Sequence, residues 1–166
     1  MRLLRRFTFV LLIWTAAAPT ARAAGQASTA TLSASLNPVA DLTLSTASVA
    51  FPDADPDTVP QIPSSAGPIL ITAKARAIAG GQVLLTVQAT DDLRSGVTII
   101  PASNITWTAT GTGFVSGTLS TTSPVTLASW TNSGVHTGSQ QLYFRNLWTH
   151  PTGTYTLSIL YTLTAP

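Results

Sequence analysis

Three carboxylates in a proline-rich stretch, Asp53, Asp55 and Asp57, are the densest group of potential metal ligands in the sequence. Calcium favours several clustered oxygen ligands, and alternating aspartates could supply them. The spacing opens like an EF-hand loop, but Thr58 stands where that loop has its glycine and Ser64 where it has its bidentate glutamate. The alternative is a solvated turn in which the aspartates accept hydrogen bonds from nearby backbone N–H groups. We prefer the turn and keep calcium as the alternative.

Three tryptophans could contact a ligand, because an exposed indole on a β-sandwich can stack against a sugar ring. Trp107 alternates with threonines and falls in phase with its apolar neighbours, which predicts a core position. Trp148 is in phase with Phe144, so a core position is predicted for it as well. Trp130 comes at a predicted strand end beside Thr131-Asn132, and it is the one tryptophan for which the sequence leaves an exposed position open, without signalling a sugar platform.

The residues that catalysis needs are scarce. His136 and His150 are the only histidines, and cysteine and glutamate are absent. No Gly-x-Ser-x-Gly nucleophile elbow occurs. Asp91 and Asp92 are adjacent, so in an extended chain they point to opposite faces and cannot work as an acid/base pair. We therefore predict no catalytic, cofactor-binding or metal-binding residues and no enzyme activity.

The N-terminus has the pattern of a cleaved signal peptide over residues 1–23. Three arginines precede an apolar stretch, Phe7–Ala18, and Ala21-Arg22-Ala23 supplies a small-x-small cleavage site before Ala24. This apolar stretch is shorter than the roughly 20 residues that span a bilayer. Arg5-Arg6 raises the twin-arginine route, but no cofactor ligands follow. We expect export through the Sec pathway to the periplasm, the cell surface or the medium.

Removal of that segment reverses the charge of the chain. The whole sequence has a net charge of +2, but four of its eight basic residues lie in residues 1–23. The remainder carries four basic residues against six aspartates, a net charge of −2. Four scattered cations cannot neutralise a run of phosphates, so nucleic acid is excluded as a partner. No disulfide is available to stabilise the fold, which must rest on a hydrophobic core.

Period-two alternation dominates the rest of the chain and predicts an all-β domain over residues 24–166. Residues 82–89 place Val83, Leu85 and Val87 on one face, and no window outside the signal shows a helical period. Gly80-Gly81, between two alternating runs, predicts a tight hairpin. Many short strands without helices favour two antiparallel sheets packed face to face, with a small barrel as the alternative. About 9–10 strands are expected from these candidates: Thr29–Leu36, Ala40–Ser45, Ser48–Phe51, Ile69–Ile78, Gln82–Thr90, Thr98–Ile100, Asn104–Thr110, Gly117–Thr121, Val125–Ser129, Gln140–Trp148 and Thr154–Thr164.

The C-terminal segment carries a resemblance. Pro151-Thr-Gly153-Thr-Tyr155, followed by an alternating run to the chain end, resembles the last strand of bacterial spore coat protein U-type and pilin-like secreted domains. That resemblance implies an immunoglobulin-like β-sandwich displayed outside the cell or assembled into a fibre, and it implies no catalytic residues. The sequence departs from these families in lacking the disulfide that they commonly carry.

Pilin-type subunits add an extended N-terminal strand to the open edge of a neighbour. Residues 29–36 have the alternation that such a donor strand needs, with Leu32 and Leu36 on one face and Ser33 and Ser35 on the other. The alternative, which Asn37-Pro38 favours, is that they form the first strand of their own sheet. The sequence thus leaves two functions open: a structural or adhesive surface subunit that associates through sheet edges, or a stand-alone binding module for glycan or calcium.

Overall fold

The computed structural model describes residues 30–166, so the predicted signal peptide lies outside the described residues. Ser35–Pro166 form one compact unit, which contains all the strands of the described chain and no α-helix. A single 3₁₀ turn, η1, spans Ala102–Asn104. The strands are β1 (Val39–Leu44), β2 (Gln61–Pro63), β3 (Ile69–Arg76), β4 (Gln82–Ala89), β5 (Leu93–Ser95), β6 (Thr98–Ile100), β7 (Ile105–Thr110), β8 (Gly117–Thr118), β9 (Val125–Thr131), β10 (Gly134–Arg145) and β11 (Ile159–Thr164).

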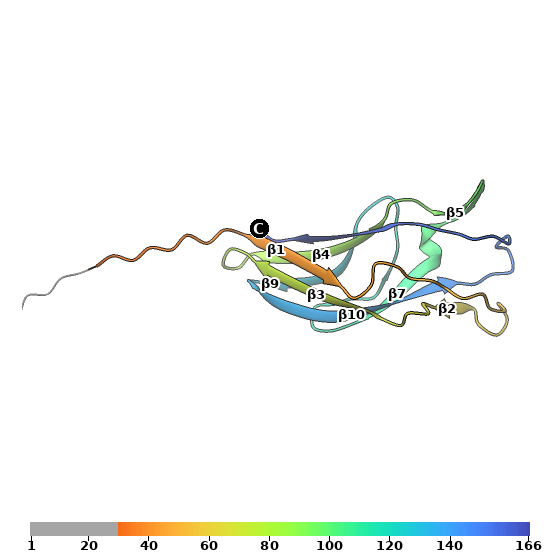
Figure 1. Cartoon of the computed structure of the whole chain (residues 1–166), viewed down its shortest axis with the longest axis horizontal. Helices are drawn as coiled ribbons and strands as arrows, with labels where there is room; N and C mark the ends of the chain where they lie inside the picture. Colours follow the sequence, from red (N-terminus) through yellow and green to blue (C-terminus); the bar gives the residue numbers. More distant parts are fainter. Residues whose placement is uncertain (1–29) are drawn as a thin grey trace, which may run out of the picture. The chain divides into compact units, whose positions relative to one another are not determined.

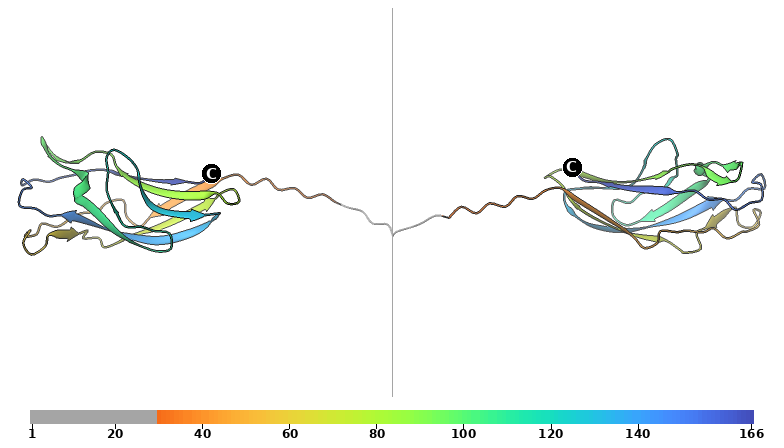
Figure 2. Two further views of the ribbon diagram at one scale, coloured as in Figure 1. Left: turned by 180° about the vertical axis from the view of Figure 1, so that it is seen from behind. Right: turned by 45° about the horizontal axis from the view of Figure 1, so that its top comes forward.

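Two antiparallel sheets and one hairpin make up the unit (Figures 1 and 2). The six-stranded sheet has the order β1-β3-β10-β7-β8, with β2 pairing beside β3 along the far part of β10. The three-stranded sheet has the order β11-β4-β9, and β5 pairs with β6 in the separate hairpin. Neighbours in the sheets are mostly distant in sequence. The chain therefore passes repeatedly from one sheet to the other.

The two sheets share one hydrophobic core. Ile71 and Ala73 of β3 are at most 1% exposed, and Val83, Leu85 and Val87 of β4 are 0% exposed. All five belong to a single cluster of buried side chains. The all-β class and the antiparallel sheets predicted from period-two alternation are confirmed. Residues 30–166 contain eleven strands rather than the expected 9–10. Two of them, β2 and β5, are missing from the candidates because they are short and carry no clear alternation.

The hairpin predicted at Gly80-Gly81 is wrong. A turn does form there, with Gly81 N–H donating to the Ile78 carbonyl at 2.9 Å and Gly80 at φ +76°. However, β3 and β4 belong to different sheets, so the turn is an arch across the sandwich. Alternation marks which face of each strand is apolar. It does not distinguish strands that pair in one sheet from strands that face each other.

Two predicted strands are not formed. Within the described part of Thr29–Leu36, residues 30–36 belong to no strand, and β1 begins only at Val39, after Asn37-Pro38. Ser48–Phe51 is likewise outside the ladders, although Phe51 packs against the core. Short apolar alternation is sufficient to suggest a strand, but a ladder also needs a partner edge within reach.

The last two predicted strands have different limits in the structure. β10 begins at Gly134, six residues before the predicted start at Gln140, and ends at Arg145. β11 begins only at Ile159, because Thr156 leaves that sheet and forms an isolated bridge with Arg94 of β5. Among residues 30–166, none forms a helix with the length and apolarity that a bilayer crossing requires.

Candidate functional site

The three aspartates lie in an ordered turn. Asp55 accepts a hydrogen bond from the Asp57 backbone N–H at 2.9 Å, and its carbonyl accepts from the backbone N–H groups of Thr58 and Val59. Asp57 accepts from the Trp148 indole N–H at 3.0 Å. In the part of the chain that the structure describes, no three histidine or acidic side chains come together in a group that could hold a metal ion. The hydrogen bonds of Asp55 are those of the turn that we preferred from the sequence.

At two of the three tryptophans, the structure differs from what the sequence suggested. Trp107 is 2% exposed, as predicted, with its indole N–H donating to the Val115 carbonyl at 2.9 Å. Trp130 is only 7% exposed, so the exposed position that the sequence left open for it is not adopted. Trp148 is 70% exposed, so its predicted core position is also wrong, because β10 has ended at Arg145 and the strand phase no longer applies.

The histidines lie near opposite ends of β10. His136 is on the inner face near its start and stacks on Trp130, with ring centroids 4.3 Å apart and planes at 10°. His150 lies beyond its end, next to Phe144, and its Nε2 is 3.1 Å from the Arg145 carbonyl. Neither ring hydrogen-bonds to a carboxylate or a serine among the described residues. The arrangement offers no general base oriented by an acidic partner.

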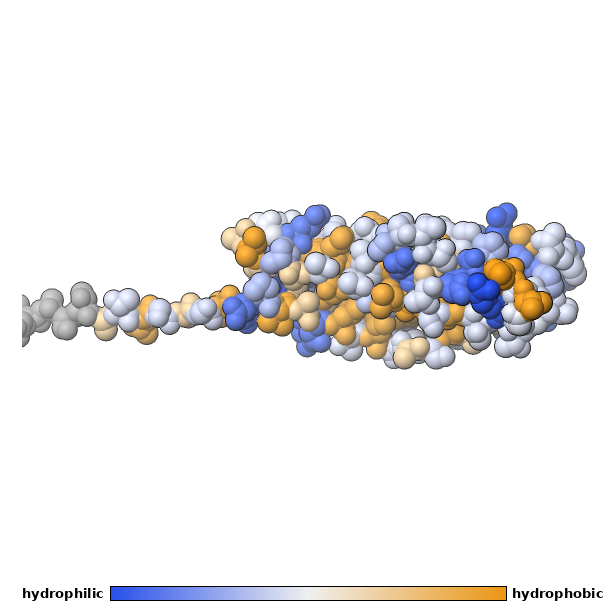
Figure 3. Space-filling view, turned by 90° about the horizontal axis from the view of Figure 1, so that it is seen from above, coloured by the Kyte–Doolittle hydropathy of each residue, from blue (hydrophilic) through white to orange (hydrophobic). Residues whose placement is uncertain are grey.

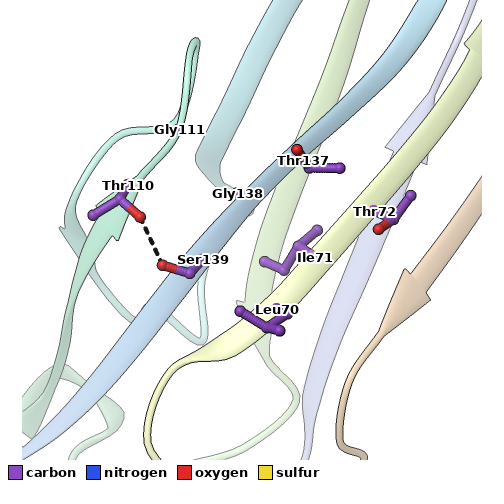
Figure 4. A pocket seen from close by; sticks show the side chains of 8 residues that line it. All are labelled: Leu70, Ile71, Thr72, Thr110, Gly111, Thr137, Gly138 and Ser139. Atoms are coloured by element: carbon purple, nitrogen blue, oxygen red, sulfur yellow. Dashed lines mark hydrogen bonds between the residues drawn. The ribbon is translucent and has the colours of Figure 1, made fainter.

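A shallow depression of about 500 Å³ opens on the outer face of the six-stranded sheet (Figure 4). Its polar groups are hydroxyls, of which those of Thr110 and Ser139 are 2.7 Å apart and share a hydrogen bond. No titratable side chain lines it; the lining residues are Leu70, Ile71, Thr72, Thr110, Gly111, Thr137, Gly138 and Ser139. The depression therefore has no acid/base group that could activate one of these hydroxyls as a nucleophile.

The long sides of the sandwich differ, and this difference defines the candidate site. On the β8–β9 side, residues 111–116 close the gap between the sheets. Val115 N–H donates to the Leu127 carbonyl at 2.9 Å, and Ser129 N–H donates to the Gly113 carbonyl at 3.1 Å. Phe114 packs edge-on against Trp130 with centroids 5.4 Å apart. Five apolar residues on this side are nearly inaccessible, namely Phe114 9%, Leu119 2%, Leu127 0%, Ala128 0% and Trp130 7% exposed, whereas Val115 is 48% exposed and Val125 is partly buried.

The opposite side, between β1 and β11, is not closed in the same way. We call this side the open seam and define it by the inner-facing apolar residues of its two walls. All of them are only partly buried, although they pack against the core: Leu42, Leu44, Val49 and Phe51 on one wall, and Tyr155, Leu157, Ile159, Tyr161 and Leu163 on the other.

Both walls of the open seam end in unpaired strand edges. Among residues 30–166, β1 pairs only with β3 and β11 pairs only with β4, so each has one edge without a ladder partner in that part of the chain. Among the described residues, no backbone hydrogen bond joins β1 to β11. The two strands lie near each other by the C-terminus and diverge away from it (Figures 1 and 2). An unpaired edge exposes a row of N–H and C=O groups that another extended chain can join.

Residues 30–36 have the pattern that such an edge accepts. They belong to no strand, and Leu32 and Leu36 are 91% and 72% exposed. A seven-residue extended segment spans about 23 Å, close to the length of six-residue β11. The alternation in this segment was visible in the sequence. The open seam was not, because nothing in a single strand's pattern tells whether it lies at an edge or in the middle of a sheet.

Comparison with protein-family models, with curated proteins and with solved structures found no match.

Proposed function

We propose that this chain is an exported, non-enzymatic structural subunit that associates with copies of itself at the open seam. Residues 30–36 of one copy add as a strand beside β11 of the next copy, with Leu32 and Leu36 toward the seam. The domain is an immunoglobulin-like sandwich that lacks one edge strand of its own. The signal-peptide pattern of residues 1–23 supports export, and repetition of the contact from copy to copy gives a fibre or coat.

The observation that carries this proposal is the asymmetry between the two sides of the sandwich. The side closed by residues 111–116 buries Leu127 completely, whereas Ile159 and Leu163 of β11 stay half-buried. Covering partly exposed apolar side chains releases about 25 cal/mol for each Å² removed from water. Strand addition would also satisfy backbone groups along the β11 edge. Both gains are available to an extended chain with alternating apolar residues.

The surface chemistry is compatible with close contact between copies. Six aspartates and four basic residues are the charged groups outside residues 1–23, and one pair of them, Lys74 and Asp41, lies 3.6 Å apart on the same sheet. In the space-filling view, the most hydrophilic residues form a few separate groups, and hydrophobic residues cover part of the visible face between them (Figure 3). Few charges need to be desolvated when one copy meets another.

The test compares two double variants of residues 24–166 by size-exclusion chromatography with light scattering over a range of concentrations. Leu32→Asp with Leu36→Asp places charges on the apolar face of the segment, and we expect a monomer. Ser33→Asp with Ser35→Asp adds the same charge to the other face, and we expect the concentration-dependent oligomers of the parent chain to remain. Equal behaviour of the two variants, or a parent chain that stays monomeric, contradicts the proposal.

A further inference from the structure

Trp148 is the most exposed aromatic side chain of described residues 30–166, at 70%. Single exposed aliphatic side chains are normal on a protein surface and need no explanation. An indole is different, because it is the largest apolar group that a chain could bury. None of the close aromatic pairs among the described residues includes Trp148, so its ring faces are not covered by another ring.

The position of this indole is held by one hydrogen bond of its own and by further bonds that join the two loops around it. Its N–H donates to Oδ1 of Asp57 at 3.0 Å, which joins loops 91 residues apart in sequence. Asn146 adds three bonds between the same loops: its side-chain amide donates to the Ala54 and Val59 carbonyls at 2.9 and 3.2 Å, and its backbone N–H donates to the Pro60 carbonyl at 2.9 Å. Trp148 itself lies in a turn that is closed by a hydrogen bond from the His150 N–H to the Leu147 carbonyl at 3.0 Å.

A side chain held in this way loses little freedom when a ligand binds. Ordering a mobile side chain costs free energy on association, and prior fixation removes much of that cost. Rigid aromatic groups on loops at the end of a β-sandwich are efficient contact residues for the same reason. The geometry around Trp148 is therefore that of a preformed contact surface.

The groups beside the ring define the ligand's chemistry. Asp57 uses only Oδ1 in its bond to the indole, and its exposed carboxylate keeps a second oxygen that can accept a hydrogen bond. Asp53 and Asp55 are exposed in the same loop. Carboxylates repel phosphates and anionic headgroups, and they accept strong hydrogen bonds from hydroxyls. The face of an indole is electron-rich and attracts the C–H groups of an apolar surface.

We propose that Trp148 and Asp57 form a binding site for a neutral carbohydrate chain. One face of a pyranose ring stacks on the indole, and ring hydroxyls donate to the free oxygen of Asp57. A quaternary ammonium or a basic peptide would also be attracted to an indole and a carboxylate. Such ligands are usually enclosed by several aromatic rings, and Trp148 provides one open face. We therefore favour the sugar and make the cation an outcome of the test.

This site is separate from the open seam and does not depend on the proposed self-association. It lies on the loops beyond the end of β10, whereas residues 30–36 precede β1 and are proposed to add beside β11 of the next copy. Trp148→Ala is expected to leave the oligomeric state of residues 24–166 unchanged. Failure of one proposal can thus be distinguished from failure of the other.

The experiment measures binding of cellohexaose, chitohexaose and maltoheptaose to residues 24–166 by isothermal titration calorimetry. We expect at least one of these sugars to bind, and Trp148→Ala to weaken that binding at least about tenfold. Trp148→Phe keeps a stacking ring and should retain part of the affinity. Asp57→Asn should weaken binding by a smaller factor, because the amide oxygen can still accept from the indole.

Val97→Ala is the matched control, because Val97 is 98% exposed in the β5–β6 turn and should not affect sugar binding. Unfolding temperatures of all variants verify that the fold is retained. The proposal is overturned if none of the three sugars binds at millimolar concentration, or if binding is the same in Trp148→Ala. Trp148-dependent binding of choline without binding of any sugar also overturns it and assigns the site to a cation.

Discussion

The Tyr161 hydroxyl donates a hydrogen bond to Oε1 of Gln140 at 2.7 Å, across the space between the two sheets. Tyr161 belongs to β11, the edge of the three-stranded sheet, and Gln140 belongs to β10 in the six-stranded sheet. Gln140 is 0% exposed. A buried amide without hydrogen bonds is costly, so this contact stabilises the position of an edge strand that has only one ladder partner.

The first prediction concerns pH. Burial raises the pKa of Tyr161 to about 12, from an ordinary value of 10.0. The neutral phenol is thus favoured in the folded state, and the unfolded chain releases this proton first. The stability that results is complete below pH 10 and is lost as the pH rises from 10 to 12. We expect a loss of about 1–2 kcal/mol from this group, measured by urea unfolding.

In Tyr161→Phe, the free energy of unfolding should no longer fall by this amount between pH 10 and 12. Tyr143→Phe is the control, because Tyr143 forms no side-chain hydrogen bond within the described residues and should keep the parent pH dependence. If Tyr161→Phe and the parent chain lose the same free energy of unfolding between pH 10 and 12, the assignment to Tyr161 is wrong.

The second prediction concerns how much the hydrogen bond between Tyr161 and Gln140 contributes to stability, apart from the burial of Gln140. At neutral pH, Tyr161→Phe should lower the free energy of unfolding by about 1–3 kcal/mol, because Oε1 of Gln140 loses its partner. Its Nε2 already has no partner among the described residues. Adding Gln140→Leu to Tyr161→Phe replaces both groups by apolar ones and should recover part of the loss. A double variant less stable than Tyr161→Phe would contradict this explanation.

The third prediction concerns the closed side of the sandwich. A Cβ atom at Gly138 would contact the Phe114 ring and lie 2.6 Å from the Thr110 carbonyl oxygen. Gly138→Ala should therefore destabilise the fold by about 1–3 kcal/mol through overpacking. Ser139→Ala, one residue away, loses only the exposed hydrogen bond to Thr110 and should change stability by less than about 1 kcal/mol. Thermal unfolding of the two variants provides the comparison.

Alternation predicted the faces of the interior strands from sequence, but it could not predict their partners. Val83, Leu85 and Val87 are buried as the pattern required, and the same kind of pattern in residues 30–36 produced no strand. The difference is whether a second edge is within reach, which depends on residues far away in sequence. The arch at Gly80 was mistaken for a hairpin for the same reason.

Trp130, which is buried, and Trp148, which is exposed, show where the inside–outside alternation of a strand cannot be read from the sequence. A register shift between Leu85 and Thr86 lets β9 place both Leu127 and Ala128 in the core, and Trp130 follows Ala128 inward. Such a bulge leaves no clear mark in the sequence. Residues 30–36 and Asp57 could be singled out from the sequence, but the open seam and the exposure of Trp148 could not: the open seam depends on sheet order, and the position of Trp148 depends on where β10 ends.

The most direct test of self-association uses the absence of cysteine in this chain. One tagged variant carries Ser33→Cys, and a second, untagged variant carries a cysteine in β11 at Leu160, Thr162 or Thr164 in turn, since the register of the added strand is open. A disulfide requires Cα atoms within about 7 Å, so it reports strand contact between copies. Thr108→Cys on β7 is the control, because Thr108 is equally exposed but far from the open seam.

After mild oxidation of each mixture, mass spectrometry measures the yield of mixed dimers. We predict a high yield for at least one β11 position and a low yield for Thr108→Cys. Equal yields at β11 and at Thr108, or no mixed dimer at any β11 position, would contradict strand addition at the open seam.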